Sequence, residues 1–141
     1  MNSTDTKIAS ALAVCPRFRW LSGMLTTRYG RVEEQVSIGL RNGDVRREPT
    51  VRDPDDFDGI DRIPVPENAL PDLDDPVTTT ALLPVFRVAY NDPSAHVVPD
   101  GGEWTAWARL DGDRAYEGVG RGPTETAALA AAILAAPRGG P

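Results

Sequence analysis

The spacing of apolar residues changes along the chain and divides it into elements. In residues 76–90 and again in residues 123–136, apolar positions recur every three or four residues, which predicts two helices with one buried face each. Residues 96–98, 103–110 and 114–119 are short runs separated by turn residues such as Asp111-Gly112-Asp113, and they predict three strands. We therefore expect the order helix, three strands, helix over residues 76–136.

Local signals place the helix ends. Asp75 and Pro76 are residue types preferred at the N-cap and at the first helical position. Pro123 should open the last helix in the same way, with Glu125 in the first turn, where the helix dipole favours an acid. Pro84 falls inside the first helical pattern and should kink that helix.

The N-terminal part carries other patterns. Residues 4–13 predict a short helix, and residues 32–40 and 45–51 predict two strands. Asn42-Gly43 lies between the strands and is the preferred pair for a two-residue hairpin turn, because both positions need positive φ. We expect a small N-terminal module over residues 1–52 that contains a helix and a β-hairpin.

Residues 53–75 differ in composition from both neighbours. They hold nine acids, one base and four prolines. Like charges repel and proline removes backbone donors, so we expect an extended acidic connector between the N-terminal module and a core at residues 76–136. Residues 137–141 should form a flexible tail.

Composition limits the functions that are open to the chain. The formal net charge of −6 gives no overall attraction for nucleic acid or an anionic membrane. No apolar run approaches the roughly 20 residues of a membrane span, and the N-terminus lacks the pattern of a secretory signal. The single Cys15 excludes an intramolecular disulfide. We expect a cytoplasmic protein without a membrane partner.

Residues 116–136, YEGVGRGPTETAALAAAILAA, run from a glycine-containing strand into an Ala-rich helix. This stretch and the order of elements resemble the double-stranded RNA-binding domain and the phage ABA-sandwich domain. The segments PRFRWLSGM (residues 16–24) and PDLDDPVTTTALLPVFRVAY (residues 71–90) are similar to blocks of an uncharacterised phage and prophage family. The resemblance implies an α+β fold with an α-β-β-β-α core of the double-stranded RNA-binding type, an origin in a phage or prophage, and a location in the bacterial host cell.

The residues at the start of the last helix do not suit RNA. A double-stranded RNA-binding domain needs several lysines there to reach phosphates across the groove. The corresponding residues are Pro123, Thr124, Glu125 and Thr126, and the C-terminal half has no lysine. A glutamate at this place repels phosphate, so double-stranded RNA is not expected as a partner.

The chain has few residues for catalysis or metal binding. His96 and Cys15 are the only histidine and the only thiol, and two such residues cannot make a zinc site. With Gly59 as the sixth position of a calcium loop, Pro54 and Val65 occupy the first and twelfth positions, where oxygen ligands are needed. We expect a non-enzymatic protein without cofactor or metal. The acidic segment is then a solvated spacer, with loose divalent-ion binding as the alternative.

The strand over residues 103–110 supplies the candidate partner-binding residues, Trp104, Trp107 and Arg109. Alternation along a strand predicts that one tryptophan points to the helices and the other to the open face of the sheet. An exposed tryptophan there invites a protein partner. A homodimer contact, or cover by the N-terminal hairpin, would explain it equally well.

A second surface is the basic and aromatic segment 17–31. Arginines and aromatics together can hold phosphates and stack bases. The candidate nucleic-acid-binding residues are Arg17, Arg19, Trp20, Arg28 and Tyr29. The interpretation we favour packs Phe18 and Trp20 into the hairpin and leaves Arg17 and Arg19 in solvent.

These observations favour a small phage or prophage accessory protein that binds a protein partner through its sheet face or its acidic surface. A sharper version of this hypothesis has the chain inhibit a host nucleic-acid-binding factor by occupying its basic channel. The alternatives are single-stranded nucleic-acid binding through segment 17–31, and a structural or assembly role in the virion.

Overall fold

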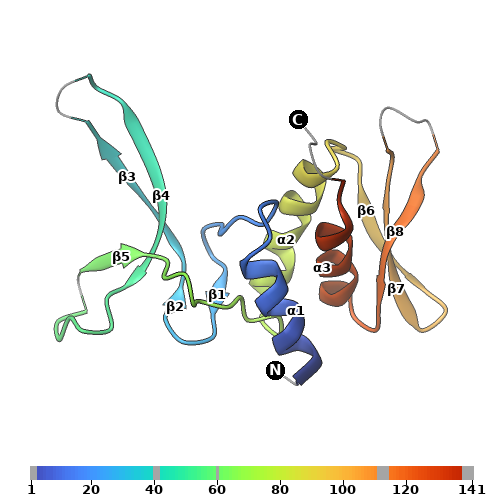
Figure 1. Ribbon diagram of the computed structural model, residues 1–141, viewed down its shortest axis with the longest axis horizontal. Coiled ribbons are helices and arrows are strands. Elements are labelled where there is room, and N and C mark those ends of the chain that lie inside the picture. The colour runs from blue at the N-terminus through green and yellow to red at the C-terminus, as the bar shows by residue number, and fades with distance from the viewer. Residues whose placement is uncertain (1–2, 40–41, 60, 111–114, 138–141) are drawn as a thin grey trace.

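The computed structural model describes residues 3–39, 42–59, 61–110 and 115–137. The helices occupy the middle of the molecule, and a sheet lies on either side of them (Figure 1). The helices are α1 (Ser3–Ala13), α2 (Pro76–Ala89) and α3 (Glu125–Ala135). The strands are β1 (Leu25–Thr26), β2 (Gly30–Arg31), β3 (Glu33–Ile38), β4 (Val45–Arg52), β5 (Arg62–Pro64), β6 (His96–Asp100), β7 (Glu103–Ala108) and β8 (Glu117–Gly122). The fold is α+β, and the predicted order of helix, three strands, helix is confirmed.

The C-terminal sheet has the strand order β6-β7-β8, and both pairings are antiparallel. Strand β8 lies three residues later than the predicted 114–119 and ends at Gly122. The reason is that Gly120 and Gly122 pair with Ala106 and Trp104, so the strand continues into residues expected to form a loop. The predicted Asp111-Gly112-Asp113 turn lies outside the described residues.

Helix α3 lies directly against β8, at a distance that only glycine permits. A Cβ atom at Gly120 would lie 2.5 Å from the carbonyl oxygen of Ala128 and 2.6 Å from the backbone nitrogen of Ala132. A Cβ atom at Gly122 would lie 2.5 Å from the Cβ of Ala127. The glycines of β8 and the alanines of α3 are therefore matched to each other, which accounts for the unusual composition of residues 116–136.

The helix ends follow from capping. Asp75 is the N-cap of α2, as predicted, and its carboxylate accepts a hydrogen bond from the Thr78 N–H at 2.9 Å. The prediction that Pro123 is the first residue of α3 was wrong. Thr124 is the N-cap, and its hydroxyl accepts a hydrogen bond from the N–H of Ala127 at 3.1 Å. Proline has no side-chain acceptor and could not pair with this N–H group.

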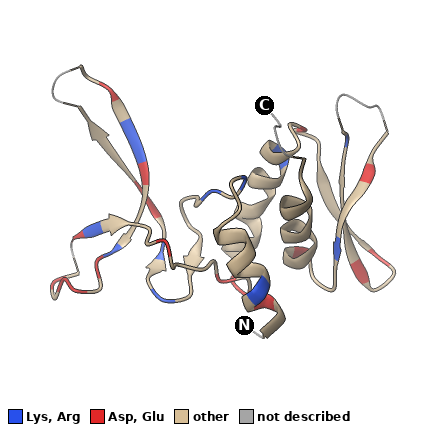
Figure 2. Ribbon diagram, in the orientation of Figure 1, with Lys and Arg blue, Asp and Glu red and all other residues tan. Residues whose placement is uncertain are grey.

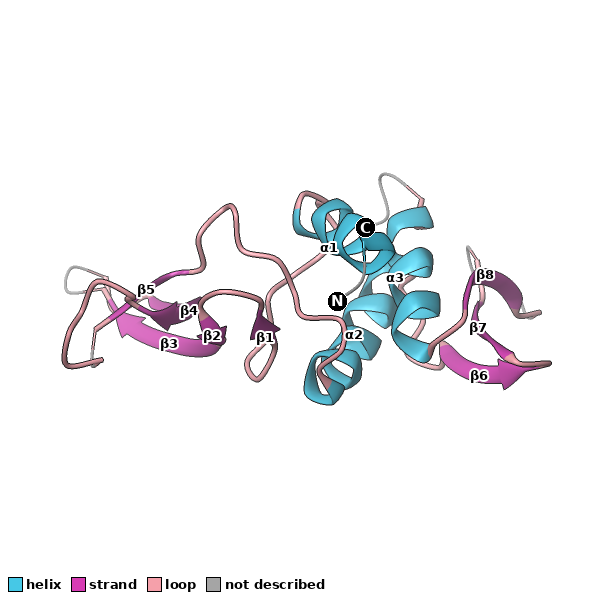
Figure 3. Cartoon of the chain, turned by 90° about the horizontal axis from the view of Figure 1, so that it is seen from below, coloured by secondary structure: helices cyan, strands magenta, loops and turns pink. Residues whose placement is uncertain are grey.

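Helices α1 and α2 pack against α3, and all three helices begin at the same end of the bundle (Figures 1 and 3). At the other end, side chains serve the last carbonyls of α3. The Tyr90 hydroxyl donates to Ala132 O at 2.7 Å, and the Arg17 guanidinium donates to Ile133 O at 3.1 Å and to Leu134 O at 2.9 Å. The N-terminal helix and the Arg17 loop thus share one core with α3, which differs from the predicted division at residue 52.

The second large sheet has the strand order β3-β4-β5. The β3–β4 hairpin confirms the predicted pair of strands, but the two-residue Asn42-Gly43 turn was wrong. Pairing extends to Ile38 and Val45, and beyond them the Gly39 N–H donates to Asp44 O at 2.8 Å. The Gly43 N–H also donates to Gly39 O at 3.0 Å, so the ladder closes at the Gly39–Asp44 pair, two residues earlier on the β3 side than the turn signal predicts.

The acidic segment is more ordered than an extended connector. Its residues 62–64 form β5, which pairs with β4. Ala69, Pro71 and Leu73 are buried, so the end of the segment packs into the body of the protein. The expectation of a purely extended spacer therefore fails for residues 62–75, where apolar side chains outweigh the charge pattern.

Candidate functional site

The tryptophans of β7 lie on opposite sides of the C-terminal sheet, as alternation predicted. Trp104 pairs with Gly122, which faces α3, whereas Trp107 pairs with Gly118 and lies beside it on the far face. Ala106, between them, is fully buried in the core. Both tryptophans are half-buried, so the open face of the sheet presents part of one indole ring.

A buried carboxylate holds the third candidate residue, Arg109. Asp92 accepts the backbone N–H of Arg109 at 2.9 Å and the hydroxyl of Ser94 at 2.7 Å. The Arg109 guanidinium lies 5.0 Å from the centre of the Tyr116 ring. Burial alone would raise the pKa of Asp92, but the hydrogen bonds from Arg109 and Ser94 outweigh it and lower the pKa. Arg109 is thus an anchored residue whose charge is partly neutralised.

The same cluster contains His96, the only histidine of the chain. Its ring packs edge-on against Tyr116, with 4.9 Å between the centroids, and its Nδ1 lies 3.0 Å from the Ser94 carbonyl oxygen. The Ser94 hydroxyl is directed to Asp92 instead. The arrangement orders the loop between α2 and β6, and it does not join a nucleophile to a base. Sequence reasoning missed this cluster, because no local signal links residues 92–96 to residue 116.

Several side chains of the basic and aromatic segment make contacts within the protein itself. Arg17 binds the end of α3, which corrects the expectation that it faces solvent. Phe18 is buried in the core and packs edge-on against Trp20, with 5.1 Å between the ring centroids. The Tyr29 hydroxyl donates to Asn68 at 3.1 Å. Arg19 and Arg28 are exposed. Nucleic-acid binding through this segment stays a prediction.

An ion pair joins the N-terminal strands to the start of α2. The guanidinium of Arg31 donates to both carboxylate oxygens of Asp75, each at 2.9 Å. The hydrogen bond from Arg31, opposed by burial and assisted by Thr78, lowers the pKa of Asp75 to about 2. One acid of the segment is therefore a structural residue. Among the described residues, no group of three or more His, Cys, Asp or Glu side chains is placed to hold a metal ion.

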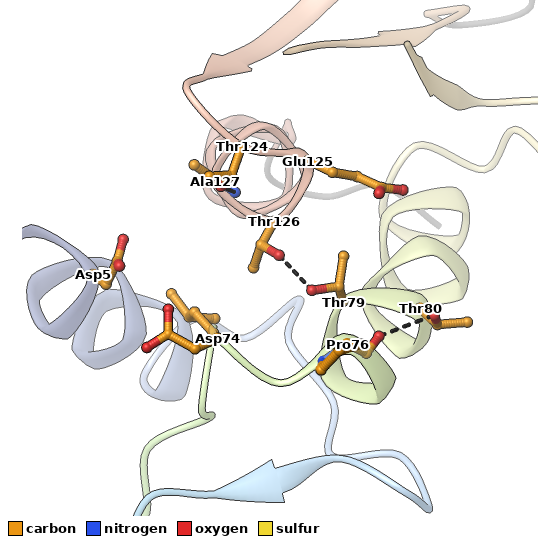
Figure 4. A pocket seen from close by; sticks show the side chains of 10 residues that line it. Asp5, Asp74, Pro76, Thr79, Thr80, Thr124, Glu125, Thr126 and Ala127 are labelled. Atoms are coloured by element: carbon orange, nitrogen blue, oxygen red, sulfur yellow. Dashed lines mark hydrogen bonds between the residues drawn. The ribbon is translucent and has the colours of Figure 1, made fainter. Parts of the chain in front are cut away.

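A polar cleft of about 470 Å³ opens where the three helices begin (Figure 4). Across it the hydroxyls of Thr79 and Thr126 are hydrogen-bonded to each other. Asp5 and Glu125, which also line the cleft, stand in the first turns of α1 and α3, where the helix dipole favours an acid. The cleft is thus polar because the first turns of the helices, with their acids and hydroxyls, line it.

Three exposed apolar side chains lie together on the hairpin formed by β3 and β4, which we call the arm. It projects away from the helices (Figures 1 and 3). Val36, Ile38 and Val45 are 56%, 69% and 59% exposed. Val36 and Ile38 alternate along β3 and Ile38 pairs with Val45, so these three side chains share one face, which we call the arm stripe.

The other face of the arm is polar. It carries Glu33, Gln35 and Ser37 from β3, with Arg46 and Glu48 opposite them on β4. The stripe face also carries Glu34 and Arg47, which lie 3.9 Å apart beside Val36. The apolar part of the arm is therefore limited to the stripe itself, and every residue of β3 is exposed. The sequence had predicted the hairpin but no site on it, because apolar alternation indicates a buried face without saying whether the cover comes from the same chain.

No protein-family model matches the chain, and no curated protein or solved structure matches it either. Among the described residues, no helix has the length and apolar character needed to cross a membrane.

Proposed function

We propose that the chain is a non-enzymatic binding and assembly protein that attaches to a protein partner through the arm. The observation that carries this proposal is the arm stripe of Val36, Ile38 and Val45, three aliphatic side chains that are each more than half exposed on one face of a projecting hairpin. Full burial of such a side chain is worth about 1.5–3 kcal/mol, so a partner that covers the stripe gains several kcal/mol.

The construction of the arm supports the proposal. Strand β5 pairs only with residues 50–52 of β4, so the outer part of the arm has two strands and no core of its own. A two-stranded hairpin is marginally stable in water. Docking against another protein surface would both bury the stripe and stabilise the hairpin. This is the assembly form of the phage accessory role that the sequence analysis favours.

The first experiment uses a tagged chain in the cells that produce it, together with the untagged chain. The test variant is Val36→Asp/Ile38→Asp, which places two charges on the stripe. The matched control is Gln35→Asp/Ser37→Asp, which places the same charges on the polar face of the same strand. We expect the wild type and the control to retain a stoichiometric protein partner, which is either an untagged copy or another protein, and the test variant to lose it. Equal recovery by both variants would contradict docking through the stripe.

A further inference from the structure

The outer edge of β3 is open, and its free backbone groups can be assigned. In the antiparallel β3–β4 ladder, hydrogen-bonded pairs alternate with pairs that make no such bonds. The bond from the Gly39 N–H to Asp44 O fixes the phase, so Gln35 and Ser37 bond to β4. Val36 and Ile38 then direct their N–H and C=O groups outward. Pro49 agrees with this phase, because it lies opposite Glu34, where no N–H is needed.

The open edge and the arm stripe thus involve the same residues. Val36 and Ile38 supply both the exposed aliphatic side chains and the unpaired backbone groups. Edge strands are usually protected by lysine, proline, a bulge or a covering segment. Residues 35–38 read Gln-Val-Ser-Ile, their pairing with β4 is regular, and β3 is the outer strand of its sheet. The edge is suited to receive another strand.

We propose that the strand received is β3 of a second copy of this chain, in antiparallel pairing centred on Val36. The proposal rests on the proposed function, since it names the partner of the arm. In this register Val36 meets Val36 of the second copy, and Glu34 meets Ile38 of the second copy. Outward-directed backbone groups then face outward-directed groups, and no glutamate lies opposite another glutamate. The two stripes join on one face of a continuous sheet.

Charge favours this occupant. Residues 33–52 contain four acids and four bases, so the arm is neutral although the chain carries a net charge of −6. Figure 2 shows both signs on the arm: the described bases lie on β4, and β3 itself carries Glu33 and Glu34. A site for a basic partner would concentrate the acidic excess on the arm, whereas the arm as a whole is neutral. In the proposed register the two acids of β3 lie at opposite ends of the paired strands, so they do not face the acids of the second copy.

Val36→Cys in a Cys15→Ser background tests the register. Residues directly opposite in an antiparallel pair have Cα atoms about 4.5–5.5 Å apart, which lies within the range that a disulfide spans. We expect Val36→Cys to give an intermolecular disulfide under mild oxidation, in at least a fivefold greater yield than Ser37→Cys in the same background. The Ser37 control lies on the same strand but is opposite Gln35 of the second copy. Equal yields, or a higher yield from Ser37→Cys, would overturn the register.

Val36→Pro tests the backbone pairing with the purified full chain. Proline keeps an apolar side chain but removes the outward N–H, and Val36→Thr is the matched variant that keeps the N–H. By sedimentation over a concentration series, we expect dimers for the wild type and Val36→Thr, and at least tenfold weaker association for Val36→Pro. Circular dichroism is the control that checks whether Val36→Pro is folded.

The outcomes separate the two proposals. A wild type that stays monomeric at all concentrations and a Val36→Cys variant without cross-links would overturn self-pairing. If the arm-dependent co-purification persisted in that case, the arm would dock on a different protein and the proposed function would stand. A dimer that Val36→Pro leaves intact would place the contact on another surface and overturn the inference.

Discussion

Replacing Gly120 by alanine adds one methyl group at the closest contact between α3 and the C-terminal sheet. The new Cβ would lie 2.5 Å from the carbonyl oxygen of Ala128, 2.6 Å from the nitrogen of Ala132 and 2.8 Å from the Cβ of Ala132. Favourable contacts of this kind lie near 3.5–4.0 Å. Two of these neighbours are backbone atoms of a helix, so no side chain can move aside and the whole of α3 must shift from β8.

The expected loss of stability is large for one methyl group. Overpacking a close-packed site costs typically 1–3 kcal/mol. A shift of α3 would also loosen Leu129 and Ile133, which are fully buried. The reduced freedom of the unfolded chain returns about 0.4–1 kcal/mol. We therefore expect Gly120→Ala to lower the free energy of unfolding by about 2 kcal/mol, which is roughly 7 °C in Tm for a chain of this size.

Gly118→Ala is the matched control, because it makes the same change in the same strand. A Cβ at Gly118 meets Thr105 Cγ2 at 3.5 Å and the Trp107 ring at 3.8 Å, which are ordinary contacts. Its stability should stay within about 1 kcal/mol of the wild type. Urea denaturation followed by circular dichroism measures both variants. Equal losses in the two variants, or a neutral Gly120→Ala, would refute the close-packing argument.

The same reasoning applies to Gly122, where a pair of substitutions can exchange the positions of a methyl group and a hydrogen atom. The Cβ added by Gly122→Ala would lie 2.5 Å from the Cβ of Ala127. The double variant Gly122→Ala/Ala127→Gly moves that methyl group from helix to strand. We expect it to recover part of the loss, since backbone atoms at 3.0 Å stay close. If the double variant lost more free energy of unfolding than the two single variants lost together, the contact between Gly122 and Ala127 would be contradicted.

Three further predictions concern single interactions, each measured by urea denaturation. The folded pKa of Asp75, about 2, lies below its ordinary 3.8, so its ion pair stabilises the protein above pH 4 and this contribution is lost as the pH falls towards 2. Asp75→Asn should lower the free energy of unfolding by about 1–2 kcal/mol at pH 7, allowing for solvent screening, and a gap that persists at pH 2 would contradict the pairing. Tyr90→Phe removes the hydrogen bond to Ala132 O and should cost about 1–2 kcal/mol; an unchanged stability would mean that the bond contributes nothing. Asp92→Ala leaves the N–H of Arg109 without its acceptor and should cost about 2–4 kcal/mol, whereas a loss below 0.5 kcal/mol would show that the buried cluster is not structural.

The elements that the sequence predicts well are those whose signals are local. The start of α2 was found from Asp75-Pro76, because a cap is a contact between residues three apart. The hairpin and the two sides of the strand bearing Trp104 and Trp107 follow from alternation within single strands. Where a second local signal competes, prediction is less exact: Thr124 displaces Pro123 at the start of α3 because its hydroxyl can cap the helix.

The features that escaped prediction depend on residues far apart in the sequence. Arg17 looked like a surface cation, but its acceptors are carbonyls more than a hundred residues away. Asp92 has no local signal of a role in the fold, yet it holds Arg109 across the loop. The acidic composition of residues 53–75 suggested a spacer, although the segment also contains a strand and buried apolar residues. Charge pattern describes solvation, and it does not reveal a partner elsewhere in the chain.

The contrast between the two large sheets bears on function. On the C-terminal side, the glycines of β8 and the alanines of α3 complement each other, so that sheet is covered from within. On the arm, Val36 and Ile38 have the same alternation but no helix to cover them. Stability and association should therefore respond to different substitutions. Changes at Gly120 should lower the free energy of unfolding without altering the surface that the arm presents to a partner. Charges on the arm stripe should abolish association. At concentrations where the wild type is monomeric, they should leave the free energy of unfolding within about 0.5 kcal/mol of the wild type, as for other exposed positions. A monomeric stripe variant that lost as much stability against the monomeric wild type as Gly120→Ala would show that the arm serves the folding of this chain rather than a partner.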